Sequence, residues 1–353
     1  MPKVSVMMPA YNVEQYIGEA IESILNQTFQ DFELIIIDDG STDDTYALGR
    51  QYAQSHANIR LLQNEQNRGI AYTRNRLLEK AKGEYLAVLD SDDVSLPDRL
   101  EKQVRFLDNH PEVGLLGGWV RYFGTPEVEG KVSERLMGAK RIACRLLFSN
   151  VFGQSTVMFR RELAPLRYDM AMPPAEDYHL WVRMSWETAT ENLPEVLVRH
   201  RVHERNISTL QADVIRRNVR EIHRQQLERL GVSPTLAQLD LHYGIGSQQL
   251  EVCADTLMAA LDWLSILDRQ NRETKKYPQG AFNLELAYHI NYLLTTFYPL
   301  GSSPMAKALN YPLVRTLIPK TRRWKFQLLA SGDSPSASPL GRALYRTYKK
   351  MKP

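Results

Sequence analysis

Residues 83–93 read Gly-Glu-Tyr-Leu-Ala-Val-Leu-Asp-Ser-Asp-Asp. The apolar run 85–89 is typical of a strand buried on both faces of a sheet, and carboxylates follow it directly. Like charges held together are unfavourable unless a positive group lies between them, and hard oxygen ligands suit Mg²⁺ or Mn²⁺. The stretch therefore predicts a divalent-metal site at the end of this strand. A helix cap and turn is the alternative interpretation, because Asp and Ser favour both.

The sequence around this stretch alternates between strand and helix patterns. Short apolar runs lie at residues 4–8, 34–37 and 59–62, and apolar residues recur at helical spacing in 17–25 and 69–81. Ser41–Asp44 predicts the start of a further helix, with a Ser cap and an acid three residues on. This alternation predicts an α/β fold with a doubly wound, mostly parallel sheet.

Polar residues follow three of the predicted strands. They are Tyr11 and Asn12 after the first strand, Asp38 and Asp39 after the second, and Asp90 and Asp92 after the fourth. In doubly wound sheets, ligands bind outside the carboxyl ends of the strands. The sequence therefore predicts that three separate segments deliver polar groups to one ligand site.

The residue types at this edge suit a nucleoside. An ionised carboxylate only accepts hydrogen bonds, so Asp38 or Asp39 could accept the N3–H of uracil, although thymine and guanine also offer an N–H. Tyr11 could stack on a base, and Asn12 could bond a ribose or a base edge. Capping acids in a strand-to-helix turn and a plain turn with a packed tyrosine are the alternatives. Neither Gly-x-Gly-x-x-Gly nor Gly-x-x-x-x-Gly-Lys-Ser/Thr follows the first strand, which argues against a dinucleotide cradle and a P-loop.

The length and the change of pattern along the chain predict its domains. At about 150 residues per domain, a chain of 353 residues predicts two domains. Long helical patterns dominate the later part, in residues 213–230, 249–268 and 282–298. We therefore expect an α/β domain over residues 1–212, a helical domain over 213–330 and a basic tail over 331–353.

The net charge of +3 hides an asymmetry along the chain. Residues 315–353 contain ten Lys or Arg and one acid, or +9, which leaves −6 for the first 314 residues. Cations interleaved with aromatics, as in Arg322-Arg323-Trp324-Lys325-Phe326, suit anionic lipid headgroups. A solvated tail and nucleic-acid binding are the alternatives. We favour reversible attachment to an anionic membrane surface and disfavour nucleic acid as a partner.

Other features of the sequence favour a cytoplasmic protein. Cys144 and Cys253 lie far apart without a partner motif, as expected of reduced thiols. The chain passes from Met1-Pro2-Lys3 directly into the first strand pattern, without the features of a secretory signal. The best candidate for a membrane span, residues 284–300, is interrupted by polar residues and predicts a buried helix instead. We expect a cytoplasmic protein whose tail can attach to the inner face of the membrane.

Four blocks of recognisable sequence follow one another in the first hundred residues. They are Val4-Ser-Val-Met-Met-Pro-Ala-Tyr-Asn12, Ile36-Ile-Asp-Asp-Gly-Ser-Thr-Asp43, Asn67-Arg-Gly69 with Arg74-Asn75, and Gly83–Asp93. Together they closely resemble glycosyltransferase family 2, which implies a GT-A fold. Ala175–Trp181 is similar to the acceptor-side acid motif of that family, and Arg201-Val-His203, with Asn206 and Ser208, is similar to its late histidine motif. The resemblance covers about residues 3–210 and leaves the C-terminal third unassigned.

The resemblance also implies a role for each candidate residue. The nucleotide-sugar site would be formed by Pro9, Ala10, Tyr11, Asn12, Asp38, Asp39, Arg68, Asp90 and Ser91, with Ala10, Tyr11, Asp39 and Arg68 on the nucleoside and Asp90 on the ribose or sugar side. Asp92 would bind Mn²⁺ or Mg²⁺, and His203 would approach the metal or the diphosphate. Asp177 would be the general base, with Glu176 as the competing candidate.

The function implied by the resemblance is inverting transfer of a sugar from a nucleoside-diphosphate sugar, with UDP as the favoured nucleotide. The acceptor would be a glycan or a lipid-linked glycan in cell-surface polysaccharide synthesis. A non-catalytic nucleotide-sugar sensor or scaffold on the same fold is one alternative, and the intact acids argue against it. A nucleotidyltransferase is another, and the lack of an early basic, Gly-rich triphosphate loop argues against that. The sequence does not predict the donor sugar, the acceptor or the linkage.

Overall fold

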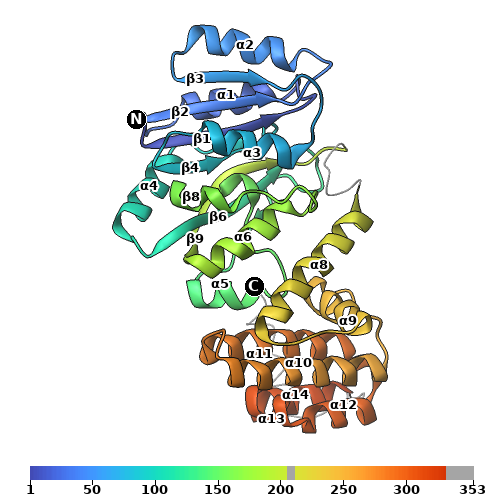
Figure 1. Ribbon diagram of the computed structural model, residues 1–353. Helices are drawn as coiled ribbons and strands as arrows, with labels where there is room; N and C mark the ends of the chain where they lie inside the picture. Colours follow the sequence, from blue (N-terminus) through green and yellow to red (C-terminus); the bar gives the residue numbers. More distant parts are fainter. Residues whose placement is uncertain (205–210, 331–353) are drawn as a thin grey trace. The chain divides into compact units, whose positions relative to one another are not determined.

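The computed structural model describes residues 1–204 and 211–330. The chain separates into two compact units. Within the described residues, the sheet unit consists of residues 1–146 and 150–219, and the helical unit consists of residues 147–149 and 220–330. The first contains the strands, and the second is made of helices (Figure 1).

The sheet unit is built on one mixed sheet. Its described strands lie in the order β3-β2-β1-β4-β8-β6-β9-β5, and β7 pairs with β6. The strands are β1 (Val4–Ala10), β2 (Phe32–Asp38), β3 (Ile59–Gln63), β4 (Tyr85–Val88), β5 (Val94–Ser95), β6 (Val113–Phe123), β7 (Val132–Ser133), β8 (Met158–Arg160) and β9 (Ala189–Arg201). The helices of this unit are α1 (Ile17–Leu25), α2 (Thr45–Ser55), α3 (Ile70–Lys80), α4 (Arg99–Asn109), α5 (Ala139–Arg145), α6 (Glu176–Glu187) and the first part of α8 (Ala212–Leu230).

The first half of the sheet is parallel, as the alternating pattern predicts. β1 pairs in parallel with both β2 and β4, and β2 pairs in parallel with β3. Every residue of β1, β2 and β4 is buried, which explains why these strands read as continuous apolar runs. This arrangement brings the carboxyl ends of β1, β2 and β4 to the same edge of the sheet.

The second half of the sheet mixes strand directions. The short strand β8 is antiparallel to both β4 and β6, whereas the long strands β6 and β9 are parallel to each other. Most of the paired residues in the sheet therefore belong to parallel strand pairs, and the antiparallel strand pairs are short. The expected α/β class with a mostly parallel sheet is confirmed. Antiparallel pairing of β5 with β9 sets Val94 opposite Arg199, so the chain that follows β9 passes beside the acidic stretch that ends at Asp93.

The predicted helix cap at Ser41 is wrong by three residues, since the N-cap of α2 is Asp44 and the helix begins at Thr45. Ser41 and Thr42 are used in another way. The Ser41 hydroxyl accepts a hydrogen bond from Asn12 N–H (3.0 Å), and Thr42 N–H donates to Asn12 Oδ1 (2.9 Å). These bonds join the turn after β1 to the turn after β2, and they hold Ser41 and Thr42 outside the helix.

The helical unit contains the end of α8 and six further helices within the described residues. They are α9 (Leu236–Ser247), α10 (Ala254–Thr274), α11 (Gln279–Phe297), α12 (Ser302–Asn310), α13 (Pro312–Leu317) and α14 (Lys320–Ala330). The three predicted helical patterns correspond to α8, α10 and α11, and α11 buries apolar and polar side chains alike. Across residues 1–204 and 211–330, no helix combines the length and the apolar character needed to cross a membrane.

Candidate active site

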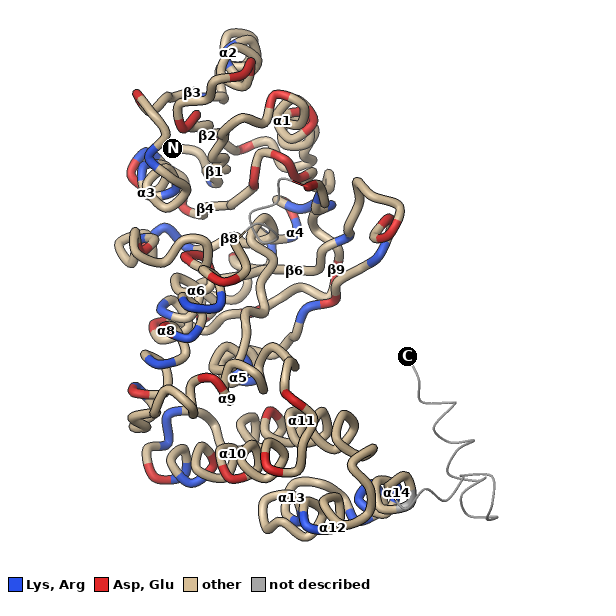
Figure 2. Tube along the Cα trace, turned by 90° about the vertical axis from the view of Figure 1, so that its right-hand side faces the viewer, with Lys and Arg blue, Asp and Glu red and all other residues tan. Residues whose placement is uncertain are grey.

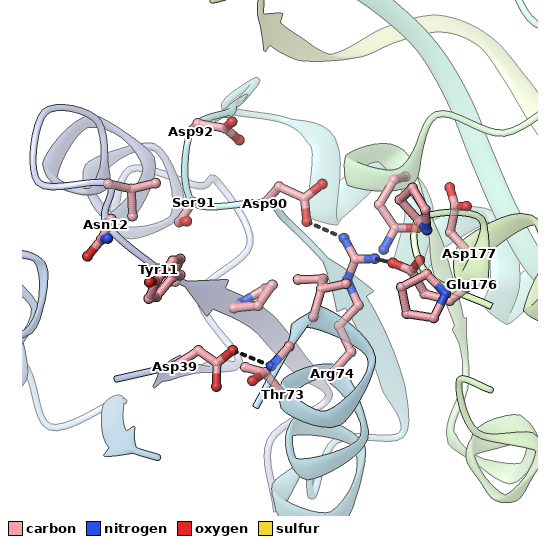
Figure 3. Close-up of a pocket in the computed structure, with 18 of the residues that line it drawn as sticks. Tyr11, Asn12, Asp39, Thr73, Arg74, Asp90, Ser91, Asp92, Glu176 and Asp177 are labelled. Atoms are coloured by element: carbon pink, nitrogen blue, oxygen red, sulfur yellow. Dashed lines mark hydrogen bonds and ion pairs between the residues drawn. The ribbon is translucent and has the colours of Figure 1, made fainter. Parts of the chain in front are cut away.

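A cavity of about 940 Å³ opens at the carboxyl ends of β1 and β4 in the sheet unit. Its walls come from distant parts of the sequence: the turn after β1, the start of α3, the stretch after β4, the first turn of α6 and the chain after β9. Figure 3 shows acidic side chains from several of these segments around one space. The predicted convergence of separate polar segments is therefore present in the folded chain.

The turn after β1 forms one wall of the cavity. Pro9, Ala10, Tyr11 and Asn12 all line it. Asn12 has a φ of 51°, a left-handed conformation that Asn tolerates better than most residues. Its side-chain oxygen accepts a hydrogen bond from Thr42 N–H, which helps to shape the turn. Tyr11 is 43% exposed, which leaves its ring accessible for stacking.

Asp39 organises the loop that leads into α3. It is buried, and its two carboxylate oxygens accept hydrogen bonds from the backbone N–H groups of Arg68 and Gly69, both at 2.9 Å. The amide of Asn64 donates a third bond to the same carboxylate. A carboxylate has about four acceptor positions, so Asp39 keeps capacity for one more donor from a ligand in the cavity.

Asp38 and Arg68 do not line the cavity, although the sequence places both in the nucleotide site. Asp38 is fully buried and accepts hydrogen bonds from Ser41 N–H and the Gln63 amide, because successive side chains at a strand end point in opposite directions. Arg68 reaches Asp39 through its backbone N–H, while its guanidinium lies 4.8 Å from the centre of the Tyr72 ring.

Arg74 lies at the base of the cavity between two acids from different segments (Figure 3). Its Nη2 pairs with Asp90 Oδ1 at 2.8 Å, and its Nη1 pairs with Glu176 Oε1. Burial opposes the positive charge of Arg74, but Asp90 and Glu176 outweigh that effect and raise the pKa of the guanidinium. Arg74 therefore binds the stretch after β4 to the start of α6.

Asp92 and His203 meet where the stretch after β4 and the chain after β9 both line the cavity. His203 Nε2 lies 3.0 Å from Asp92 Oδ2, and the His203 ring stacks on Tyr16 with centroids 5.0 Å apart. Neighbouring residues fix this contact, because Asp93 bonds His200 Nδ1 (3.0 Å) and Arg201 N–H (2.9 Å). The end of β9 is thereby held against the acidic stretch.

The Asp92–His203 pair matches the donor set of an open metal site. A carboxylate and an imidazole are both suitable ligands for Mn²⁺, and such ions often take their remaining ligands from substrate phosphates and water. Among the described residues, no group of three or more His, Cys, Asp or Glu is placed to hold a metal ion. Any metal held here would therefore take its further ligands from a bound diphosphate or from water.

Asp177 lines the cavity from the first turn of α6. Burial and the neighbouring Glu176 carboxylate raise the pKa of Asp177 to about 7, although Arg74 acts in the opposite direction. Its Oδ1 accepts a hydrogen bond from Tyr178 N–H at 2.6 Å. A carboxylate with such a pKa is suited to exchange protons near neutral pH.

Most of the sequence-predicted site residues therefore share one cavity. Those that line it are Pro9, Ala10, Tyr11, Asn12, Asp39, Asp90, Ser91, Asp92, Glu176, Asp177 and His203. Asn206 and Ser208 lie outside the described residues. The following five residues also line the cavity without having been predicted from the sequence: Arg74, Gln154, Pro173, Pro174 and His200. Only Arg74 carried a signal, since it belongs to one of the four family-like blocks.

The fold and this cavity together define an α/β scaffold with an acidic ligand site at the carboxyl ends of its strands. The model of the family "Glycosyl transferase family 2" matches residues 5–165. The EpsE protein of Bacillus subtilis (strain 168) is 37% identical over 206 residues, which cover 57% of this chain and 73% of that relative. The Escherichia coli enzyme named UDP-Glc:alpha-D-GlcNAc-diphosphoundecaprenol beta-1,3-glucosyltransferase WfgD is 32% identical over 51% of this chain and 68% of its own length. The chain belongs to glycosyltransferase family 2.

A solved structure supports the same assignment of the fold. S. aureus TarS 1-349, crystallised in complex with UDP-GlcNAc, superposes with a TM-score of 0.54 at 21% identity. The match covers 91% of this chain and 92% of that one. The GT-A fold expected from the sequence is thus confirmed.

Proposed function

We propose that this glycosyltransferase moves a sugar, with inversion, from a nucleoside-diphosphate sugar to a glycan or lipid-linked glycan acceptor in cell-surface polysaccharide synthesis. One observation carries the proposal: Tyr11, Asp39, Asp92 and Asp177 line a single cavity. In this cavity, the ring of Tyr11 would stack on the base and Asp39 would accept a base N–H. Asp92 would lie on the phosphate side, and Asp177 would be the proton acceptor. The name of WfgD specifies a UDP-linked donor and a lipid diphosphate acceptor, which supports UDP and a lipid-linked glycan here.

Asp177 would act as the general base. The acceptor hydroxyl must lose its proton as its oxygen attacks the anomeric carbon, and a carboxylate within about 3 Å can take that proton. Attack from the side opposite the leaving diphosphate inverts the anomeric centre. Glu176 is less suited to this role, because Arg74 already binds it at the base of the cavity.

Asp92 and His203 would hold a divalent metal, Mn²⁺ or Mg²⁺, beside the donor diphosphate. When bound, such an ion neutralises the charge that grows on the leaving group. The protein itself orients the two ligands, because Asp93 fixes the end of β9 and Tyr16 packs on the His203 ring. Tyr11 and Asp39 would then position the nucleoside at the other end of the diphosphate.

A donor screen tests this proposal. The purified chain is offered UDP-, GDP- and dTDP-sugars with Mn²⁺, with and without lipid-linked glycan acceptors, and both released nucleotide and glycosylated product are measured. We expect release of nucleoside diphosphate, with the best rate for a UDP-sugar and an acceptor present. Tight nucleotide-sugar binding by calorimetry without any product would instead favour a sensor or scaffold. Release of pyrophosphate when the chain is offered a nucleoside triphosphate and a sugar 1-phosphate would favour a nucleotidyltransferase.

Asp92→Asn is expected to weaken Mn²⁺ binding in the presence of UDP by at least about 10-fold, because the amide lacks the charge of the carboxylate. Calorimetric titration of Mn²⁺ into the chain saturated with UDP measures the effect without relying on turnover. Asp240→Asn is the matched control, since Asp240 forms a surface ion pair with Arg220 in the helical unit. Unchanged Mn²⁺ affinity in Asp92→Asn would contradict the assignment of this metal ligand.

The basic C-terminal region would attach the enzyme reversibly to anionic membrane. α13 and α14 carry exposed Arg315, Lys320 and Arg322 together with Trp324, which is 54% exposed, and Figure 2 marks the basic residues of this region in blue. Five further cations lie in residues 331–353, which are outside the described residues. Each cation near an anionic surface contributes on the order of 1 kcal/mol, so the region as a whole favours binding.

Ending the chain at Ala330 is expected to weaken binding to anionic vesicles at least about 10-fold, and Arg315→Glu with Arg322→Glu to weaken it further. This end point keeps Leu313, Val314 and Phe326, which are buried in the helical unit. Co-sedimentation with phosphatidylglycerol vesicles at low and high salt measures the effect, with Lys275→Glu and Lys276→Glu as a charge-matched control. Equal binding of the full chain to neutral and anionic vesicles would refute the proposal.

A further inference from the structure

A three-residue segment links the two units through the backbone. Residues 147–149 belong to the helical unit, while residues up to 146 and from 150 on belong to the sheet unit. Within the helical unit, Phe148 is 1% exposed and its ring packs against two imidazoles. The centroid distances are 4.7 Å to His242 and 4.1 Å to His289.

The backbone of this segment is held as firmly as its side chain. His242 Nε2 lies 2.8 Å from Leu147 O, and Trp263 Nε1 donates to His242 Nδ1 at 3.0 Å. Burial lowers the pKa of His242 to about 4, so the ring is neutral and donates through Nε2. α9 approaches so closely that a Cβ added to Gly246 would lie 2.1 Å from Phe148 O. Only glycine fits at that position without displacing the segment.

Both residues that flank the segment contact the first turn of α6 in the sheet unit. Tyr178 OH donates to Leu146 O at 2.6 Å. Asn150 Nδ2 lies 3.5 Å from Asp177 Oδ2, and Asn150 Oδ1 accepts from Phe152 N–H at 3.0 Å. Leu146, before the segment, thus contacts Tyr178, and Asn150, after it, contacts the candidate base Asp177. The segment between them is packed among the helices of the helical unit.

We propose that the helical unit positions the general base: by anchoring Leu147–Ser149, it holds Leu146 and Asn150 against the first turn of α6 and so fixes Asp177. Phe148 and Gly246 are positioning residues in this scheme, since neither lines the cavity. The inference rests on the proposed role of Asp177, and it gives the C-terminal helices a function in the transfer step.

Gly246→Ala tests the inference, with Gly280→Ala as the matched control. Gly280 lies in α11 of the same unit, and a Cβ there meets nothing within 4 Å. A base displaced by about 1 Å can cost about 100-fold in rate, so we expect Gly246→Ala to lower kcat by 10–100-fold. The Kd for UDP should stay within about twofold of wild type, because nothing on the nucleoside side of the cavity changes. Phe148→Leu is the second variant, to be used if Gly246→Ala does not fold.

Two further readouts separate positioning from general destabilisation. Loss of the Asn150 contact removes a donor from ionised Asp177, so the acid limb of the kcat–pH profile should move to higher pH in Gly246→Ala and in Asn150→Ala alike. The double variant should lose no more activity than the worse single variant, because both act on one contact. Additive losses, or an unmoved pH profile in a folded Gly246→Ala protein, would overturn the inference.

Amide hydrogen exchange on the full chain keeps this test independent of the proposed reaction. Faster exchange at residues 146–150 and 176–180 is expected in Gly246→Ala and not in Gly280→Ala. If wild type transferred no sugar but exchange changed in this way, the coupling would stand and the proposed function would fail. If wild type were active and exchange at α6 were unaffected by Gly246→Ala, the coupling would fail alone.

Discussion

Asp177→Asn is expected to lower kcat by 10²–10⁴-fold, the usual contribution of a general base. The amide has nearly the same shape as the carboxylate but cannot take the proton of the acceptor hydroxyl. Nucleotide binding should survive, because Tyr11 and Asp39 lie on a different wall of the cavity. Nucleotide release measured with saturating donor and acceptor, together with calorimetry for UDP, separates the two effects. Asp240→Asn again serves as the control for an Asp-to-Asn change far from the site.

The pH profile of the wild type adds a signature that a structural defect would not produce. Burial and Glu176 raise the pKa of Asp177 to about 7, and the base must be ionised to work. Activity should therefore rise with pH through about 7 and level off above it. An acid limb near pH 7 that persists in Asp177→Asn, or a fall in kcat of less than about threefold, would contradict the assignment.

Glu176→Gln distinguishes the two adjacent acids. Removal of the Glu176 charge lowers the pKa of Asp177, so the acid limb of the profile should move to lower pH rather than disappear. If Glu176 were the base, Glu176→Gln would abolish the limb and Asp177→Asn would only shift it. The two profiles, measured side by side, therefore identify the proton acceptor.

The sequence predicted the parallel half of the sheet well, because its buried strands are local runs bounded by turn residues. It placed Asp90 and Asp92 at the correct edge for the same reason, since they follow β4 directly. The residue pattern alone could not choose between Asp38 and Asp39, although the family resemblance implied Asp39 for the nucleoside, because the direction of a side chain at a strand end is set by the loop packed on it. Asp39 reaches the cavity only because the loop before α3 folds over its carboxylate.

Contacts between distant segments were beyond sequence reasoning. The Arg74–Glu176 pair joins residues 102 positions apart, and no local pattern marks either residue as the partner of the other. Phe148 is a second example. Its apolar side chain predicts burial, but the sequence does not indicate that it is buried in the helical unit. Long-range pairing of this kind depends on how α3, α6 and the strands pack, and that packing follows from the whole fold.

Arg74→Gln is expected to destabilise the sheet unit by about 3–5 kcal/mol and to reduce transfer activity. Arg74 is buried and compensates two acids, Asp90 and Glu176, so its loss leaves carboxylates without a positive partner in a low-dielectric site. Denaturant unfolding measures the free energy, and Arg50→Gln, an exposed substitution on α2, should change it by less than about 0.5 kcal/mol. Arg74→Lys should also be impaired, because a single ammonium cannot bond both acids as the guanidinium does.

A double variant identifies the cause of the loss. If uncompensated charge is responsible, Arg74→Gln combined with Glu176→Gln should be more stable than Arg74→Gln alone, since one buried carboxylate is then neutral. If the two substitutions instead destabilise additively, Arg74 acts by packing and not by charge. Recovery of stability should not restore activity, because Asp177 would remain on a first turn of α6 that is no longer tied to Asp90 through Arg74. The double variant would thus recover stability without recovering activity. This is expected if the Arg74 guanidinium both compensates the charges of Asp90 and Glu176 and helps to position Asp177.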